Sequence, residues 1–94
     1  MQRSYAYGTI RESRRTAIYV VRVKDDVIDD VEADAIAARM REKLLSRGES
    51  ATDIVVVQGG PKETLRLHGM PYSVNRVRAA MFNAALRWTP LELD

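Results

Sequence analysis

The sequence predicts one small α+β domain whose elements follow the order ββαββα. Three observations indicate this fold: two runs rich in β-branched residues at 16–23 and 53–58, two segments with apolar residues at helical spacing, and a length of 94 residues. Two separate cores in so short a chain would each fall near the size at which folding becomes marginal. We therefore expect residues 1–94 to form a single domain.

The N-terminal part is typical of a β-hairpin. Residues Ser4 to Ile10 alternate weakly and contain Gly8, which lowers the strand propensity of this segment. Residues Thr16 to Val23 are a stronger strand because β-branched and aromatic side chains dominate them. The polar residues 11–15 between the two strands predict the loop of the hairpin.

A long helix is expected to begin near Asp30. Asp29 is followed three residues later by Glu32, which is the pattern of a capping box, and Gly48 stands where a left-handed helix end is favoured. Apolar residues recur at helical spacing along the side that we expect to face the core: Ala33, Ile36, Ala37, Met40 and Leu44.

The second half of the chain predicts two further strands and a second helix. Residues 53–58 form a strand that is apolar on both faces and needs cover on both. Residues 59–62 predict a hairpin turn, and residues 63–68 an alternating strand. A second, basic helix begins with Pro71 as its first residue or with Ser73 as its N-cap and runs to Trp88. It ends before Pro90, because the residue that precedes proline is pushed toward extended geometry. The remaining residues form a tail or a short last strand.

We expect these elements to build a four-stranded antiparallel sheet with two helices on one face. From residue 16 onward the order β-α-β-β-α-β is that of the split βαβ arrangement, which predicts a ferredoxin-like fold or a permuted relative. The N-terminal strand would then take the edge that the last strand usually holds. The strand at 53–58 would lie at the opposite edge of the sheet, flanked only by its hairpin partner.

An edge strand that is apolar on both faces favours association with a second chain. We therefore expect a homo-oligomer, most simply a dimer, that buries apolar strand residues between its subunits. The expected interface comprises Ile18, Val20, Val55 and Val57, with Met81, Phe82 and Trp88 as anchors.

Composition excludes several classes of site. The chain has no cysteine, which excludes disulfides, thiolate metal sites and cysteine nucleophiles. The first residues lack the apolar core of a signal peptide, and no apolar run approaches the ~20 residues of a membrane span, so we expect a cytoplasmic protein without a membrane partner. The formal net charge of +2 is too balanced to predict a polyanionic partner by itself.

Two chemical candidates have simpler interpretations. His68 is the only histidine and could serve as a general base, but a single imidazole on a polar strand face is usually solvated. The acidic run from Asp25 to Asp34 could bind a divalent cation, yet it lacks the ligand pattern of a calcium loop, and the start of a helix explains it. We therefore expect no catalytic, cofactor or metal site, and a non-enzymatic protein.

The leading functional hypothesis is a self-associating protein-interaction or regulatory module. The alternative is a nucleic-acid-binding module, in which strand tyrosines stack on bases and nearby arginines contact phosphates. A protein partner other than a second copy is also open. The residues expected to contact a partner or a nucleic acid are Tyr5, Tyr7, Arg11, Arg14, Arg15, Arg66, His68 and Arg76.

Overall fold

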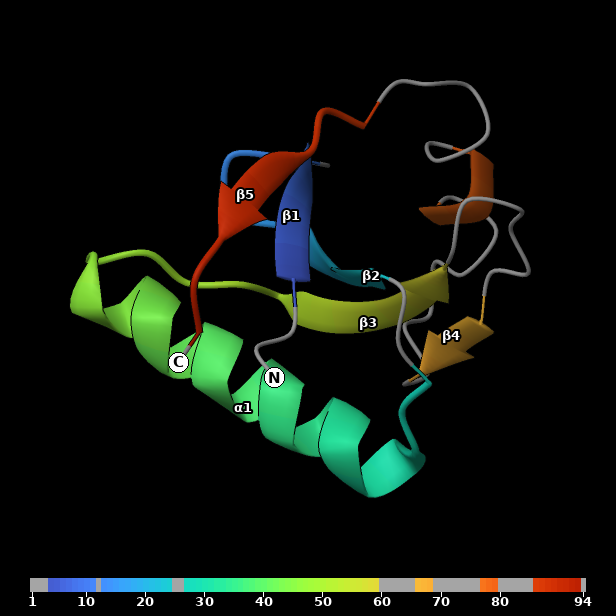
Figure 1. The fold of residues 1–94 in the computed structure, drawn as a ribbon. Helices are drawn as coiled ribbons and strands as arrows, with labels where there is room; N and C mark the ends of the chain where they lie inside the picture. The colour runs from blue at the N-terminus through green and yellow to red at the C-terminus, as the bar shows by residue number, and fades with distance from the viewer. Residues whose placement is uncertain are drawn as a thin grey trace.

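The computed structural model describes residues 4–11, 13–24, 27–59, 66–68, 77–79 and 86–93. These residues form a small α+β fold with one mixed sheet and a long helix against one of its sides (Figure 1). In chain order the elements are β1 (Ser4–Arg11), β2 (Ala17–Lys24), α1 (Asp30–Ser46), β3 (Asp53–Gly59), β4 (Arg66–His68) and β5 (Thr89–Leu91). Residues 77–79 add a short helical segment.

The predicted N-terminal hairpin is confirmed. β1 and β2 pair antiparallel along their whole length, from Ser4 opposite Lys24 to Arg11 opposite Ala17. In the turn, the Ser13 hydroxyl accepts hydrogen bonds from the backbone N–H groups two and three residues later, both at 3.2 Å. This side-chain contact to the backbone stabilises the reversal of the chain.

Gly8 stands in the middle of β1 because Leu86 occupies the space that a side chain would need there. A Cβ atom at Gly8 would lie 2.6 Å from Cγ of Leu86, well inside the contact distance of two carbon atoms. Gly8 pairs with Val20 of β2, and Val20 and Leu86 belong to the same buried cluster. The residue that lowers strand propensity therefore makes room for a core side chain.

α1 begins and ends where the sequence predicts. The Asp29 carboxylate accepts a hydrogen bond from the backbone N–H of Glu32 at 2.8 Å, which makes Asp29 the N-cap. At the other end Gly48 has φ of 72°, and the N–H of Glu49 donates to the carbonyl of Leu44 at 2.9 Å. This is the Schellman arrangement, in which a left-handed residue ends the helix.

β2, α1 and β3 form a β-α-β unit with adjacent parallel strands. The 17 residues of α1 span about 25 Å at 1.5 Å per residue, close to the length of the strand that precedes it. The helix therefore returns the chain to the starting end of β2, where the N–H of Thr52 donates to the carbonyl of Ala17 at 2.9 Å. From there β3 runs beside β2 in the same direction.

The prediction of an all-antiparallel, four-stranded sheet is wrong. The strand order is β4-β3-β2-β1-β5, so the two strands that α1 connects are direct neighbours, and the ferredoxin-like order is not confirmed. β3 lies inside the sheet rather than at its edge, as its apolar side chains on both faces require. β5 pairs with the other edge of β1, so the N-terminal strand and the chain end both join the sheet.

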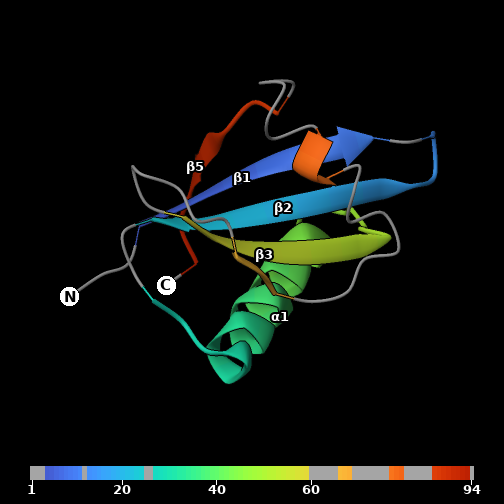
Figure 2. The same ribbon diagram turned by 90° about the vertical axis from the view of Figure 1, so that its right-hand side faces the viewer.

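The prediction that both helices cover one face is also wrong. α1 covers one side of the sheet, whereas the helical residues 77–79 lie on the opposite side, where Val77 packs with Val20 and Val55 (Figure 2). Residues 86–88, which we expected to be helical, are not. The remainder of the predicted second helix lies outside the described residues. The apolar strands thus receive cover on both faces from their own chain.

β4 is the hairpin partner that the sequence predicts for β3, and its three described residues pair antiparallel with that strand. Residues 63–65 of the predicted strand fall outside the described part of the chain. Within that part, no helix is long and apolar enough to span a membrane.

Candidate functional site

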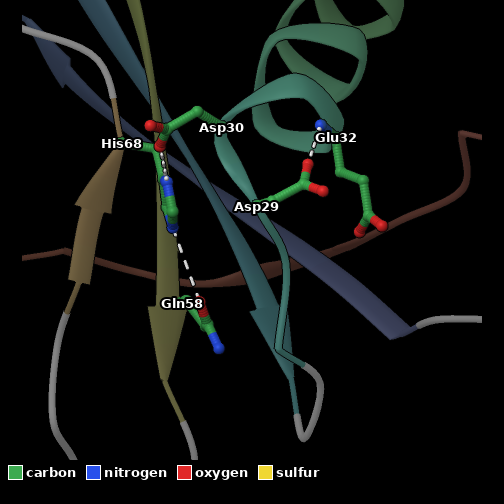
Figure 3. Close-up of polar contacts among 5 residues, drawn as sticks. All are labelled: Asp29, Asp30, Glu32, Gln58 and His68. Carbon is green, nitrogen blue, oxygen red and sulfur yellow. Dashed lines mark hydrogen bonds and ion pairs between the residues drawn. The ribbon is translucent and has the colours of Figure 1, made fainter.

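Polar side chains from three elements meet where β3 ends and α1 begins. Gln58 belongs to β3, His68 to β4, and Asp30 is the first residue of α1 (Figure 3). The carboxyl ends of the parallel strands β2 and β3 lie at this end of the sheet. In open α/β sheets this is the end at which ligands usually bind. The cluster is therefore the first candidate for chemistry.

His68 lies between the other two side chains. Its Nδ1 is 3.0 Å from Oδ1 of Asp30, and its Nε2 is 3.5 Å from Oε1 of Gln58. Only 11% of the His68 side chain is exposed, whereas 95% of the Asp30 side chain is exposed. Figure 3 shows the imidazole pointing with one nitrogen toward the start of α1 and with the other toward Gln58.

The contact with Asp30 indicates which ring nitrogen of His68 carries a hydrogen. An ionised carboxylate can only accept, so Nδ1 carries a hydrogen and donates to Asp30. Donation from Nε2 to Oε1 of Gln58 then requires the doubly protonated ring, whereas the amide turned by 180° would instead donate to a neutral ring. Gln58 can thus serve as a partner in either protonation state.

This arrangement suits a structural contact better than catalysis. Both ring nitrogens of His68 face groups of the chain, which leaves neither free to take a proton from a substrate. An ion pair with so exposed a carboxylate stabilises the fold little. Among the described residues, no three histidine or carboxylate side chains converge to hold a metal ion. The cluster connects β4 to the start of α1.

Tyr5 and Tyr7, expected to stack on bases, lie on the side of the sheet that α1 covers. Tyr5 is buried in the core, and Tyr7 is partly buried with its ring stacked on Tyr19 at a centroid distance of 6.4 Å. The Tyr19 hydroxyl donates to the carboxylate of Glu49 at 3.4 Å. Burial of Tyr19 and the negative charge of Glu49 both raise the pKa of Tyr19. Of Tyr5, Tyr7 and Tyr19, only Tyr7 is left partly accessible to a base.

The basic residues expected to contact a partner are spread over the sheet. Arg11, Arg14 and Arg15 are exposed together at the turn between β1 and β2. Arg66 lies in β4, opposite Gln58, and β3 separates β4 from the β1–β2 hairpin that carries this turn. Arg76 lies outside the described residues. The turn arginines form one basic cluster, to which neither Arg66 nor His68 belongs.

The opposite side of the sheet carries one unusual cation. The Arg22 guanidinium lies over the ring of Trp88, 5.5 Å from its centroid, which is a cation–π contact. Nε of Arg22 is buried and, within the described part of the chain, has no hydrogen-bond partner.

The valines predicted to form an interface are fully buried on this same side, so they belong to the core of the single chain.

The exposed large apolar side chains of the described residues lie on α1 or just before it. The large apolar side chains that remain exposed are Val27, Val31 and Leu45, at 76, 78 and 64% exposure. The residues that we call the outer face of α1 are Val31, Ala35, Ala38 and Leu45, all exposed. They lie opposite the buried residues of the same helix, Ala33, Ile36, Met40 and Leu44.

Sequence reasoning missed both of these features. The pairing of His68 with Asp30 joins residues far apart in sequence, and no local pattern indicates it. The outer face of α1 does leave a signal, because Val31 and Leu45 fall at helical positions opposite the apolar stripe that predicts the core. Large apolar residues on the polar side of an otherwise amphipathic helix are the signal that could have revealed the outer face of α1.

Comparison of this chain with protein-family models, with curated proteins and with solved structures finds no match. The function is therefore inferred from the geometry of the chain itself.

Proposed function

We propose that this chain is a non-enzymatic, cytoplasmic α+β domain that self-associates through the outer face of α1 and serves as a protein-interaction or regulatory module. One observation carries the proposal: the exposed large apolar side chains of the described residues all lie on or beside this helix. Apolar side chains that gather on one exposed surface are typical of a protein contact. The occupant that fits this surface best is a second copy of the chain.

The charges of α1 favour a second copy. Residues 29–37 hold four carboxylates and no base, whereas residues 38–47 hold four basic side chains and one carboxylate. A surface that is acidic at one end and basic at the other is complementary to itself when two copies meet in opposite directions. No external partner is needed to neutralise it.

The contact surface differs from the one that the sequence predicts. The valines of β2 and β3 are buried under Val77 and Leu86 of the same chain, so they are not available to a second one. The surface proposed to pair is therefore the side of α1 that faces away from the sheet, and not an exposed edge strand.

Sedimentation velocity and light scattering at tens to hundreds of micromolar test this proposal. We expect the wild-type mass to rise toward that of a dimer, and Val31→Ser combined with Leu45→Ser to remain monomeric. Both positions are exposed, so the thermal unfolding midpoint of this variant should stay near that of the wild type. Arg14→Ala combined with Arg15→Ala is the matched control and should associate normally. A monomeric wild type over the whole range contradicts the proposal, as does undiminished association of the serine variant.

A second candidate function, nucleic-acid binding, is favoured by the exposed cluster of Arg11, Arg14 and Arg15 at the β1–β2 turn. Such a cluster contacts phosphates, and its affinity should fall steeply as salt is added. Fluorescence anisotropy with a single-stranded oligonucleotide measures this. We expect Arg14→Ala with Arg15→Ala to abolish binding, while the serine variant of α1 keeps it. Absence of binding at low salt removes this candidate.

A further inference from the structure

The outer face of α1 has a symmetric pattern of large and small residues. Val31, Ala38 and Leu45 follow one another at intervals of seven residues, and seven residues fall only about 20° short of two helical turns. The three residues therefore form a nearly straight line along the exposed side. A small residue stands at its midpoint, and a large apolar residue, 78% or 64% exposed, stands at each end.

Two copies of this line can meet in two directions. In an antiparallel pair with a twofold axis at Ala38, Val31 of each copy meets Leu45 of the other, and the two Ala38 residues face each other. Small side chains at the crossing allow the helix axes to approach closely. In a parallel pair, Val31 would meet Val31 and Leu45 would meet Leu45. Apolar packing alone does not choose between the two.

The charges beside the line favour the antiparallel direction. Asp34 and Arg41 are both exposed, and they lie on the same flank of the line, one before and one after Ala38. A twofold axis brings this flank of one copy against the same flank of the other. Asp34 of each copy then faces Arg41 of the other. A parallel pair has its twofold axis along the helices and brings this flank against the opposite one, so Asp34 faces Ala35 and has no charged partner there. Arg41 would then face Glu42, but the acidic residues 29–37 of the two copies would lie side by side.

We propose that two copies of this chain pair through α1 in the antiparallel direction, with the twofold axis at Ala38 and with Asp34 facing Arg41 across it. This inference rests on the self-association proposed above and adds the direction and the register. A single pair of helices of this length buries less surface than a permanent interface does, so the dimer is expected to be weak and reversible.

Introduced cysteines test the register, because the natural chain contains none. Under mild oxidation Ala38→Cys should form covalent dimers, since the two residues meet on the axis. Val31→Cys alone and Leu45→Cys alone should remain monomeric, because an antiparallel pair keeps the two copies of either residue about 21 Å apart. A mixture of these two variants should form a mixed disulfide. Ser50→Cys, exposed between α1 and β3, is the control for random collision.

Charge exchange tests the proposed contact beside the axis. Asp34→Arg and Arg41→Asp should each weaken dimerisation by roughly fivefold or more, because the axis places two such contacts in every dimer. The double variant should restore dimerisation to near the wild-type level. Thermal unfolding of every variant checks that the fold is kept.

The outcomes separate this inference from the proposed function. Efficient disulfide formation by Val31→Cys alone shows a parallel pair and overturns the register, while self-association stands. A wild-type dimer in which none of the α1 cysteines cross-links above the Ser50→Cys control places the contact elsewhere. A wild type that stays monomeric overturns the proposed function itself.

Discussion

The two sides of the sheet are covered in different ways. On one side α1 is a long helix that is capped at both ends and buries one apolar stripe against β1, β2 and β3. On the other side, the described cover consists of Val77 and Leu86, with Ile10 and Trp88 packed around them. The first side is built from a regular element. The second depends on individual contacts, such as that of Leu86 with the space above Gly8.

The contrast between the two sides shows which parts of the core a local sequence pattern can define. The stripe of α1 repeats at helical spacing, so each member supports the prediction of the others. The space above Gly8, which Leu86 alone fills, leaves no repeating pattern in the sequence, so only the folded chain reveals it.

The largest expected effect is on the α1 side. Ile36 is 1% exposed and lies in the centre of the buried stripe. Ile36→Ala should lower the free energy of unfolding by about 2–5 kcal/mol, since it removes buried methyl groups and leaves a cavity. Val31→Ala, on the outer face of the same helix, is the matched control and should change it by no more than about 0.5 kcal/mol. Urea unfolding followed by circular dichroism measures both. Equal losses would show that the two sides of α1 are not distinct.

The next effect is on the opposite side of the sheet. Gly8→Ala should destabilise the protein by about 1–3 kcal/mol, because the new methyl group would overlap with Leu86. If the overlap is the cause, Leu86→Ala should cost less in the Gly8→Ala background than in the wild type. A double-mutant cycle by chemical unfolding gives this coupling. If the two losses of stability are purely additive, the cost of Gly8→Ala arises within β1 itself and not from overlap with Leu86.

The sequence predicts most of the elements but not their arrangement. The caps of α1 follow from Asp29, Glu32 and Gly48, since capping is decided by residues close in sequence. The parallel pairing of β2 with β3 is different, because a strand–helix–strand segment can place its two strands side by side or on either side of a third. The apolar character of β3 on both faces was the clue that it lies inside the sheet.

The candidate site shows the same limit. His68 was identified from its residue type alone, whereas its partner Asp30 comes from an element 38 residues away in the chain. Strand alternation could place Tyr5 and Tyr7 on one side of the sheet but not tell that α1 would cover that side. Contacts between elements depend on which faces meet, and a single sequence holds no direct record of that.

A weaker change in stability is expected on the α1 side at high pH. In the folded protein, burial and the charge of Glu49 hold the pKa of Tyr19 above its ordinary value of 10.0. Above pH 10 the unfolded chain therefore releases this proton while the folded chain retains it, so the stability falls as the pH rises. We expect Tyr19→Phe to unfold with a shallower loss of stability above pH 10, and Glu49→Gln to lie between it and the wild type.

Chemical unfolding at a series of pH values from 7 to above 10 measures the difference between each variant and the wild type, which cancels the titration of the other tyrosines and lysines. Tyr7, whose ring stacks on Tyr19, provides the control variant Tyr7→Phe. Identical slopes for Tyr19→Phe and the wild type would show that the Tyr19 hydroxyl is as well hydrated in the folded chain as in the unfolded one. The α1 side of the sheet would then be open to water at its Glu49 end. The cover on this side would be less continuous than the packing indicates, and the two sides of the sheet would differ less.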